Sequence, residues 1–202
     1  MCTAPVAEGG LGWSSSEYGF FSGAYGYINV FLLMLFFGGI ILDRCGVRFT
    51  GVMSSSLMLG GALLKWYALS TDFGDATFLG YHLQVVLAAL GFAIFGMGAE
   101  ITGITVTKVI VKWFQGKEMA LAMGLQVAMA RIGTAVALAC SLPLAKAMGH
   151  VSYPVLFGAI CLCVGLLAYL VYCVMDKKLD RSLEAVDSDP EERFHLSDLK
   201  LI

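Results

Sequence analysis

Two ionised residues lie within stretches of sequence that are otherwise apolar or small. Glu100 lies midway along "ALGFAIFGMGAEITGITVTKV", and Arg131 lies within "GLQVAMARIG". A charged side chain at the centre of a lone membrane helix costs roughly 2.5–3.5 kcal/mol on insertion scales. Each charge should therefore face a partner, water or the interior of a helix bundle. Both residues are candidates for a functional site.

Two interpretations of this pair stay open. Consecutive membrane helices run antiparallel, so Glu100 and Arg131 can reach a similar depth, and a buried ion pair would then simply join two helices. In the alternative, the two charges line a cavity and hold opposite ends of a zwitterion. A carboxylate suits an ammonium group, and a guanidinium binds a carboxylate through two parallel hydrogen bonds.

Neutral polar side chains could complete such a cavity. Tyr25 and Asn29 are spaced by one helical turn and therefore share a face, while Gln126 precedes Arg131 on the same predicted helix. A polar stripe of this kind also forms hydrogen bonds between helices, which is the alternative reading. We take Tyr25, Asn29 and Gln126 as candidate substrate contacts.

The composition indicates a membrane protein. The chain has 202 residues, of which 58% are hydrophobic and 14% charged, against roughly 25% charged in a typical soluble domain. The net charge of -2 argues against a nucleic-acid partner. The six cysteines have neither a disulfide pattern nor zinc spacing, so we expect buried thiols and no metal or cofactor.

Five stretches are long enough to cross a hydrocarbon core of about 30 Å. They predict an all-α membrane protein with short connections. The expected spans are Tyr18–Leu42, Gly51–Leu69, Leu83–Val111, Met119–Ala145 and Pro154–Met175.

Lysine and arginine set the predicted orientation, because cytoplasmic loops carry an excess of both. The basic connections after the first, third and fifth spans lie on one side, which we assign to the cytoplasm. Residues 1–17 are then extracytoplasmic, residues 18–175 hold the five helices, and residues 176–202 form a cytoplasmic linker. We expect Lys65 and Lys108, near helix ends, to extend their ammonium groups outward from the apolar layer.

The first basic connection, "GGIILDRCGVRFTG", resembles the signature between the second and third helices of the major facilitator superfamily. The resemblance implies a conformational latch, in which the aspartate and arginines bond to neighbouring helix ends. The residues that match the signature are Gly39, Asp43, Arg44, Gly46 and Arg48.

A narrower resemblance covers about residues 12–201. "FGMGAE", "KWFQGKE" and "GLQVAMARIG", in this order, are similar to a dipeptide-carrier subfamily with lysosomal and bacterial members. This likeness implies that Glu100 holds a peptide amine, Arg131 a carboxylate, and Asn29 a further polar contact. Phe92 replaces an arginine of many proton-coupled members, so we do not expect proton coupling by that route.

The resemblance also implies that the five helices are numbers two to six of a twelve-helix transporter. The chain would then be a fragment of the N-terminal six-helix half, with the first helix and the C-terminal half missing. The expected function is transport of dipeptides or similar zwitterionic or anionic metabolites by alternating access. The lipid bilayer, the small-molecule substrate and the missing half are the expected partners.

Other functions remain to be weighed against transport. A membrane scaffold or accessory subunit would also use five helices with small-residue packing faces. An enzyme is not expected, because no nucleophile and base pair stands out. We expect a multi-pass protein of a bacterial inner membrane, with the lysosomal membrane as the alternative.

Overall fold

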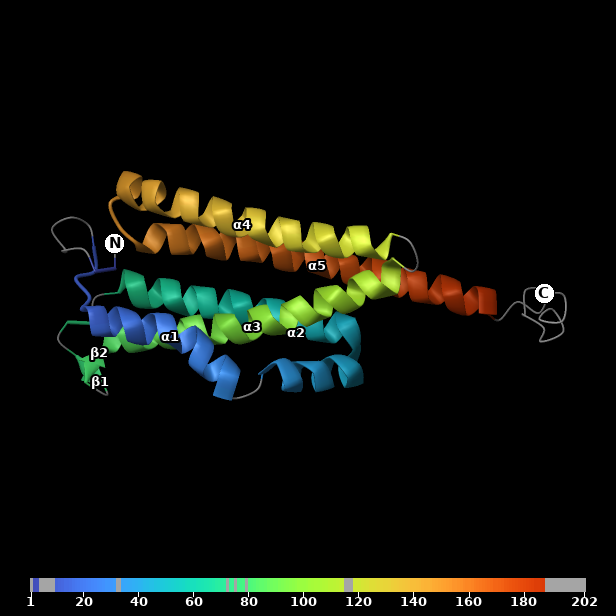
Figure 1. Ribbon diagram of the computed structural model, residues 1–202, viewed down its shortest axis with the longest axis horizontal. Coiled ribbons are helices and arrows are strands. Elements are labelled where there is room, and N and C mark those ends of the chain that lie inside the picture. Colours follow the sequence, from blue (N-terminus) through green and yellow to red (C-terminus); the bar gives the residue numbers. More distant parts are fainter. Residues whose placement is uncertain are drawn as a thin grey trace. The chain divides into compact units, whose positions relative to one another are not determined.

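The computed structural model describes residues 2–3, 10–31, 34–71, 73–74, 76–78, 80–114 and 118–187. The described part is helical apart from one small antiparallel hairpin, in which Thr77 pairs with His82 (Figure 1). Its elements are α1 (Ser15–Phe31), α2 (Met34–Ser70), β1 (Thr77–Phe78), β2 (Tyr81–His82), α3 (Leu83–Trp113), α4 (Met119–Met148) and α5 (Ser152–Asp187). The prediction of an all-α membrane fold is confirmed.

The chain divides into two compact units within α5, at residues 166 and 167. The first unit holds α1 to α4 and the beginning of α5. The second holds the rest of α5, where the Tyr172 hydroxyl donates a hydrogen bond to Asp176 Oδ1 at 3.1 Å. Helix α5 continues to Asp187, beyond the predicted end of the last span, and residues 188–202 of the predicted linker lie outside the described residues.

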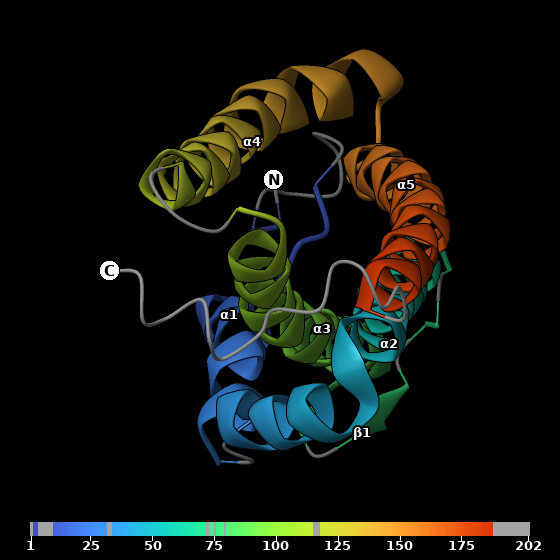
Figure 2. The same cartoon turned by 90° about the vertical axis from the view of Figure 1, so that its right-hand side faces the viewer.

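The first predicted span does not form one helix. Residues 18–42 are divided between α1, which ends at Phe31, and the beginning of α2. The predicted loop after this span is instead a bend within α2 at Gly46, whose φ of 77° and ψ of 170° are essentially restricted to glycine. Figures 1 and 2 show the first part of α2 turned sharply away from the rest. An apolar run predicts length but does not reveal such a division.

Helices α2 and α3 approach each other at small residues. A Cβ atom added at Gly61 would lie 2.4 Å from the Phe95 backbone nitrogen, and one at Gly91 would lie 2.7 Å from that of Lys65. At Gly98, a Cβ would lie 2.6 Å from the Ser54 carbonyl oxygen. Because these neighbours are backbone atoms, only glycine allows this close packing.

A core joins α1, α2 and α3 near the hairpin. Its buried members are Trp13, Ala68, Leu69, Val85 and Ala88. We call the end of the first unit that contains the hairpin and the α4–α5 turn at Gly149 the hairpin end. The opposite end, which contains residues 43–48 and the end of α3, is the latch end. Trp13, which lies just before α1, is therefore part of this core.

Glu17 fixes the start of α1 at the hairpin end. Its carboxylate accepts hydrogen bonds from the Ser14 backbone N–H and hydroxyl, both at 2.8 Å, while the Ser14 hydroxyl oxygen accepts one from the Glu17 N–H. This reciprocal pattern is a capping box. Glu17 also bonds to His82 Nδ1, so it connects α1 to the residue before α3.

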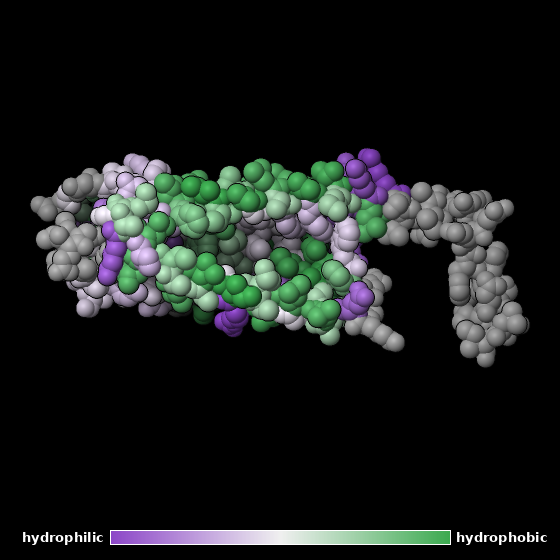
Figure 3. Space-filling view, turned by 90° about the horizontal axis from the view of Figure 1, so that it is seen from above, coloured by the Kyte–Doolittle hydropathy of each residue, from purple (hydrophilic) through white to green (hydrophobic). Residues whose placement is uncertain are grey.

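Four helices in the described part are long and apolar enough to cross a membrane. They are Leu35–Ser70, Leu83–Trp113, Met119–Met148 and Ser152–Arg181. Most side chains of α4 are exposed, and Ala145 is its one buried residue. Apolar side chains gather along the helices, and most hydrophilic ones lie near their ends, apart from one hydrophilic patch midway along the lower edge of the view (Figure 3). This distribution suits a hydrocarbon environment, where backbone groups must be satisfied within helices.

Candidate functional site

A contact between α1 and α3 holds the predicted acidic site residue. The Tyr25 hydroxyl donates a hydrogen bond of 2.9 Å to Glu100 Oε1. Both side chains are half-buried. No hydrogen bond to Glu100 Oε2 is present among the described residues, so this oxygen can accept one from an ammonium group. The structure thus brings together two of the residues predicted to bind substrate.

Asn29 lies beside this contact. The positions of Tyr25 and Asn29 depend on Gly96, because a Cβ there would lie 2.7 Å from Tyr25 Cδ2 and 2.8 Å from Asn29 Nδ2. Both polar atoms of the Asn29 amide are buried and have no partner among the described residues. A buried amide without a partner is unfavourable by about 1–3 kcal/mol, and a ligand that pairs with it removes this cost.

Arg131 and Gln126 lie on α4, where they line a shallow pocket of about 250 Å³ with Ala130 and Thr134. Arg131 is exposed. In the part of the chain that the structure describes, no hydrogen bond or ion pair joins Arg131 to Glu100. The structure therefore assembles Tyr25, Asn29 and Glu100, while Arg131 and Gln126 form a separate group on another helix.

The signature aspartate has a partner at the latch end. Asp43 Oδ1 lies 2.7 Å from Lys108 Nζ, and the two side chains are 78% and 44% exposed. This ion pair connects α2, just before its bend, to the last part of α3. The position of Lys108 near a helix end predicts only that its ammonium extends outward from the apolar layer. The signal that would have revealed the pair is that Asp43 and Lys108 lie at the cytoplasmic ends of the first and third predicted spans.

The other signature residues have different surroundings. Gly46 forms the bend, whereas Gly39 is helical and has open space where a Cβ would lie. Arg44 is exposed and Arg48 is half-buried. The glycine at residue 46 is thus required by the backbone, and the glycine at residue 39 is not required by any close contact among the described residues.

Lys65 differs from its predicted position. Its Nζ lies 5.1 Å from the centroid of the Phe92 ring and 5.5 Å from that of Phe95, within cation–π range. Phe92 also stacks on Phe21 of α1, with centroids 5.1 Å apart. Lys65 therefore lies against aromatic rings inside the first unit, and its ammonium does not extend outward as expected. Its position depends on contacts that spacing along one helix cannot reveal.

Comparison with known proteins assigns the family. The Major Facilitator Superfamily profile matches residues 2–201, nearly the whole chain. The chain belongs to the major facilitator superfamily. This assignment agrees with the signature at residues 39–48 and with the apolar helices. It confirms the resemblance stated for the sequence and the partial major facilitator fold.

Similar curated proteins are named lysosomal dipeptide transporter MFSD1. The Bos taurus protein is 30% identical over 187 residues, which cover 87% of this chain and 37% of that protein. The Homo sapiens protein is 28% identical over 186 residues, with the same coverage. The Danio rerio protein is 33% identical over 114 residues, or 55% of this chain and 22% of that protein. The chain thus spans little more than a third of the length of the two longer matches.

Proposed function

We propose that this protein is a secondary transporter that binds dipeptides and carries them across a membrane by alternating access. The observation that carries the proposal is the group formed by Tyr25, Asn29 and Glu100. It presents a carboxylate and an amide without a partner to one region between α1 and α3. The similar proteins named dipeptide transporters support the choice of substrate class.

Each group has a separate role in this proposal. The Glu100 carboxylate binds the peptide ammonium, and Tyr25 orients it through its hydrogen bond. The Asn29 amide has both a donor and an acceptor, which suit the C=O and N–H of the peptide bond. Arg131 binds the terminal carboxylate, and Gln126 provides a neutral polar contact beside it.

Alternating access would use the latch end. In this proposal the latch consists of Gly39, Asp43, Arg44, Gly46 and Arg48, and its aspartate pairs with Lys108 in the conformation described here. We place residues 1–17 and the hairpin end outside the cytoplasm, and the latch end and residues 176–202 inside. The remaining helices of the transporter complete the substrate cavity.

We infer that the protein is a transporter rather than an enzyme. No group of histidine, cysteine or carboxylate side chains suited to a metal ion is present among the described residues. A bacterial inner membrane remains the predicted location, while the similarity to proteins named lysosomal dipeptide transporters favours the lysosomal membrane as the alternative.

Uptake by the protein at its full natural length in liposomes tests this function. We expect Glu100→Gln and Arg131→Gln to lower uptake of radiolabelled alanylalanine by at least about 100-fold, since each leaves one end of the zwitterion unpaired. Glu118→Gln and Lys146→Gln, which change exposed charges at helix ends, are matched controls with normal uptake. Equal folding of all variants is checked by their melting temperatures.

Modified dipeptides assign each charge to one residue. N-acetylation removes the ammonium, so the acetylated peptide should compete equally weakly for uptake of the labelled dipeptide by the wild type and by Glu100→Gln. A C-terminal amide should do the same for Arg131→Gln. Normal uptake by both variants would reject this site. Absence of dipeptide uptake by the wild type would favour the scaffold function.

A further inference from the structure

Lys65 carries a positive charge that no residue neutralises within the described part of the chain. Its ammonium contacts the faces of Phe92 and Phe95, and no carboxylate or hydrogen-bond acceptor is bonded to it there. Contact with aromatic faces offsets only part of the cost of removing a cation from water. An anion that reached this ammonium would therefore bind favourably.

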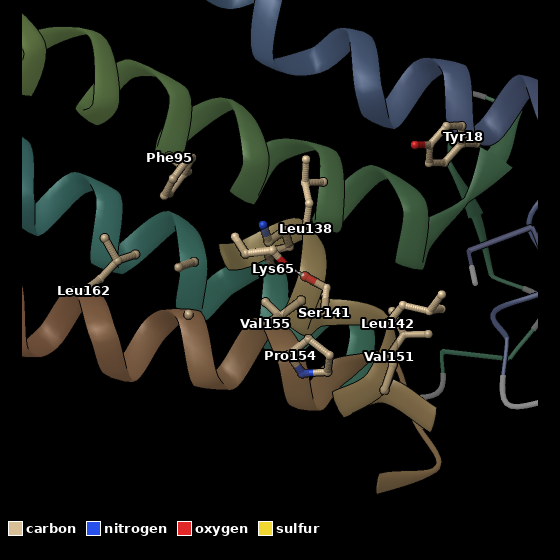
Figure 4. A pocket seen from close by; sticks show the side chains of 14 residues that line it. Tyr18, Lys65, Phe95, Leu138, Ser141, Leu142, Val151, Pro154, Val155 and Leu162 are labelled. Carbon is tan, nitrogen blue, oxygen red and sulfur yellow. Dashed lines mark hydrogen bonds between the residues drawn. The ribbon is translucent and has the colours of Figure 1, made fainter. Parts of the chain in front are cut away.

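The Lys65 side chain lines a cavity of about 720 Å³ within the first unit. Lys65 reaches it from α2, Phe95 from α3 and Leu138 from α4, as the close view shows (Figure 4). The opposite wall is formed by Pro154 and Val155 of α5. The volume is sufficient for a small organic molecule. We call this space the Lys65 cavity.

The polar groups of the Lys65 cavity favour an anion. The Ser141 hydroxyl donates its proton to the Ala137 carbonyl oxygen, so Ser141 is not counted among the donors available to a ligand. Tyr18 also lines the cavity, and its hydroxyl has no bonded partner among the described residues. Lys65 and Tyr18 therefore provide donors without an accompanying carboxylate, a set that suits a carboxylate ligand.

The Lys65 cavity lies toward the hairpin end from the proposed dipeptide site. Phe95 precedes Glu100 by five residues on α3, which corresponds to about 7.5 Å along a helix axis. On α4, Leu138 follows Arg131 by seven residues, or about 10 Å. Two extended residues span about 7 Å, so the separation along the axis of α3 between Glu100 and the cavity wall at Phe95 is about the length of a dipeptide.

We propose that the Lys65 cavity is an anion subsite that binds a carboxylate on the substrate side chain, and that it favours dipeptides with an acidic residue. This inference rests on the proposed dipeptide transport, which it makes more specific. Lys65 acts here as a specificity-determining residue, with Tyr18 as a second donor. The aromatic rings of Phe92 and Phe95 hold the ammonium in place.

Competition between two nearly isosteric dipeptides tests the subsite. The protein at its full natural length, in liposomes, should prefer alanylglutamate to alanylglutamine. Lys65→Met keeps an unbranched apolar chain against the rings but removes the charge, so we expect it to reduce this preference by roughly tenfold. Lys65→Arg should keep the preference, and Lys146→Gln, an exposed charge in the last turn of α4, should not change it.

A second readout does not depend on transport. Hexanoate, a carboxylate with a short apolar tail, should raise the melting temperature of the wild type and Lys65→Arg in uncharged detergent, but not that of Lys65→Met. If hexanoate stabilises through Lys65 and no dipeptide is taken up, the proposed function is wrong and the subsite stands. If dipeptides are taken up and Lys65→Met retains both the selectivity and the hexanoate effect, the subsite is wrong.

Discussion

Helices α1 to α3 and helix α4 each carry one of the two charges predicted to hold a zwitterion, in contrasting surroundings. Glu100 lies beside the close α2–α3 contact and is bonded to Tyr25 of α1. Arg131 lies on a helix that buries only Ala145. At Gly124 and Gly133 of α4 there is open space where a Cβ would lie, whereas Gly61 and Gly98 meet neighbouring backbone. Small residues are thus structurally required in one region and not in the other.

The difference separates two roles for one predicted pair of charges. Around Glu100, the side chains are already positioned by packing, as expected for the part of a site that is preorganised before a ligand binds. Arg131 has no comparable support among the described residues. We therefore expect a dipeptide to bind first at the preorganised group, before its carboxylate binds Arg131 on α4.

The largest effect on stability should come from the α2–α3 contact. Gly61→Ala places a methyl group 2.4 Å from the Phe95 nitrogen and 2.6 Å from the Gly91 oxygen, and neither backbone atom can yield without separating the helices. We expect a loss of about 3 kcal/mol in the free energy of unfolding. The measurement is reversible unfolding in detergent micelles, followed by circular dichroism.

Gly133→Ala is the matched change on α4. With open space at this position, alanine should stabilise the helix by up to about 1 kcal/mol. Both substitutions replace glycine with alanine, so changes of opposite sign in the free energy of unfolding would establish that α2 and α3 are closely packed at their glycines and α4 is not. A similar loss from both substitutions would show that α4 is packed as closely as α2 and α3.

Glycine spacing illustrates what sequence alone can predict. Repeated small residues indicate close helix packing in both "GFAIFGMG" and "GLQVAMARIG", yet only the glycines of the first segment lie against atoms of another helix, whereas Gly124 and Gly133 have open space. Apolar length predicted α3 and α4 nearly to their ends, because each helix is local. The Tyr25–Glu100 bond joins residues 75 positions apart, and Lys65 depends on rings from another helix. Such pairings depend on tertiary packing, which spacing along one segment does not specify.

A smaller effect is expected at the starts of α1 and α4. Glu17 caps α1, whereas Glu118 precedes α4 and makes no capping hydrogen bond with its side chain. Glu17→Gln should lower the free energy of unfolding by about 1–2 kcal/mol, because it weakens charge-assisted bonds to Ser14 and His82. Glu118→Gln should change it by less than about 0.5 kcal/mol. Equal effects would remove the distinction between the two helix starts.

The contribution of Glu17 to stability also depends on pH. Burial raises the pKa of Glu17, but hydrogen bonds from His82 and Ser14 outweigh it and lower this pKa from 4.5 to about 2. Its contribution to stability is therefore complete above pH 4.5 and is lost as the pH falls from 4.5 toward 2. The free energies of unfolding of the wild type and Glu17→Gln should therefore converge as the pH falls over this interval. A constant difference between them would contradict the assigned cause.

The smallest effect on stability should come from the Asp43–Lys108 pair at the latch end. Both side chains are substantially exposed, so water and salt screen their attraction, and we expect a coupling energy below about 1 kcal/mol. A double-mutant cycle with Asp43→Asn and Lys108→Gln measures it at low and high salt. A coupling well above this value that salt does not reduce would contradict the exposed geometry.

Conformational exchange distinguishes a latch from an ordinary surface ion pair. A weak pair can still change the ratio of two conformations if it forms in only one of them, because an equilibrium responds to the difference in free energy between the states. Asp43→Asn should therefore change the populations of the two conformations. The distribution of distances between spin labels at the hairpin end measures these populations, and the free energy of unfolding should change little. If Asp43→Asn leaves the distance distribution unchanged, the Asp43–Lys108 pair is an ordinary surface ion pair and not a latch. The scaffold function predicts this result.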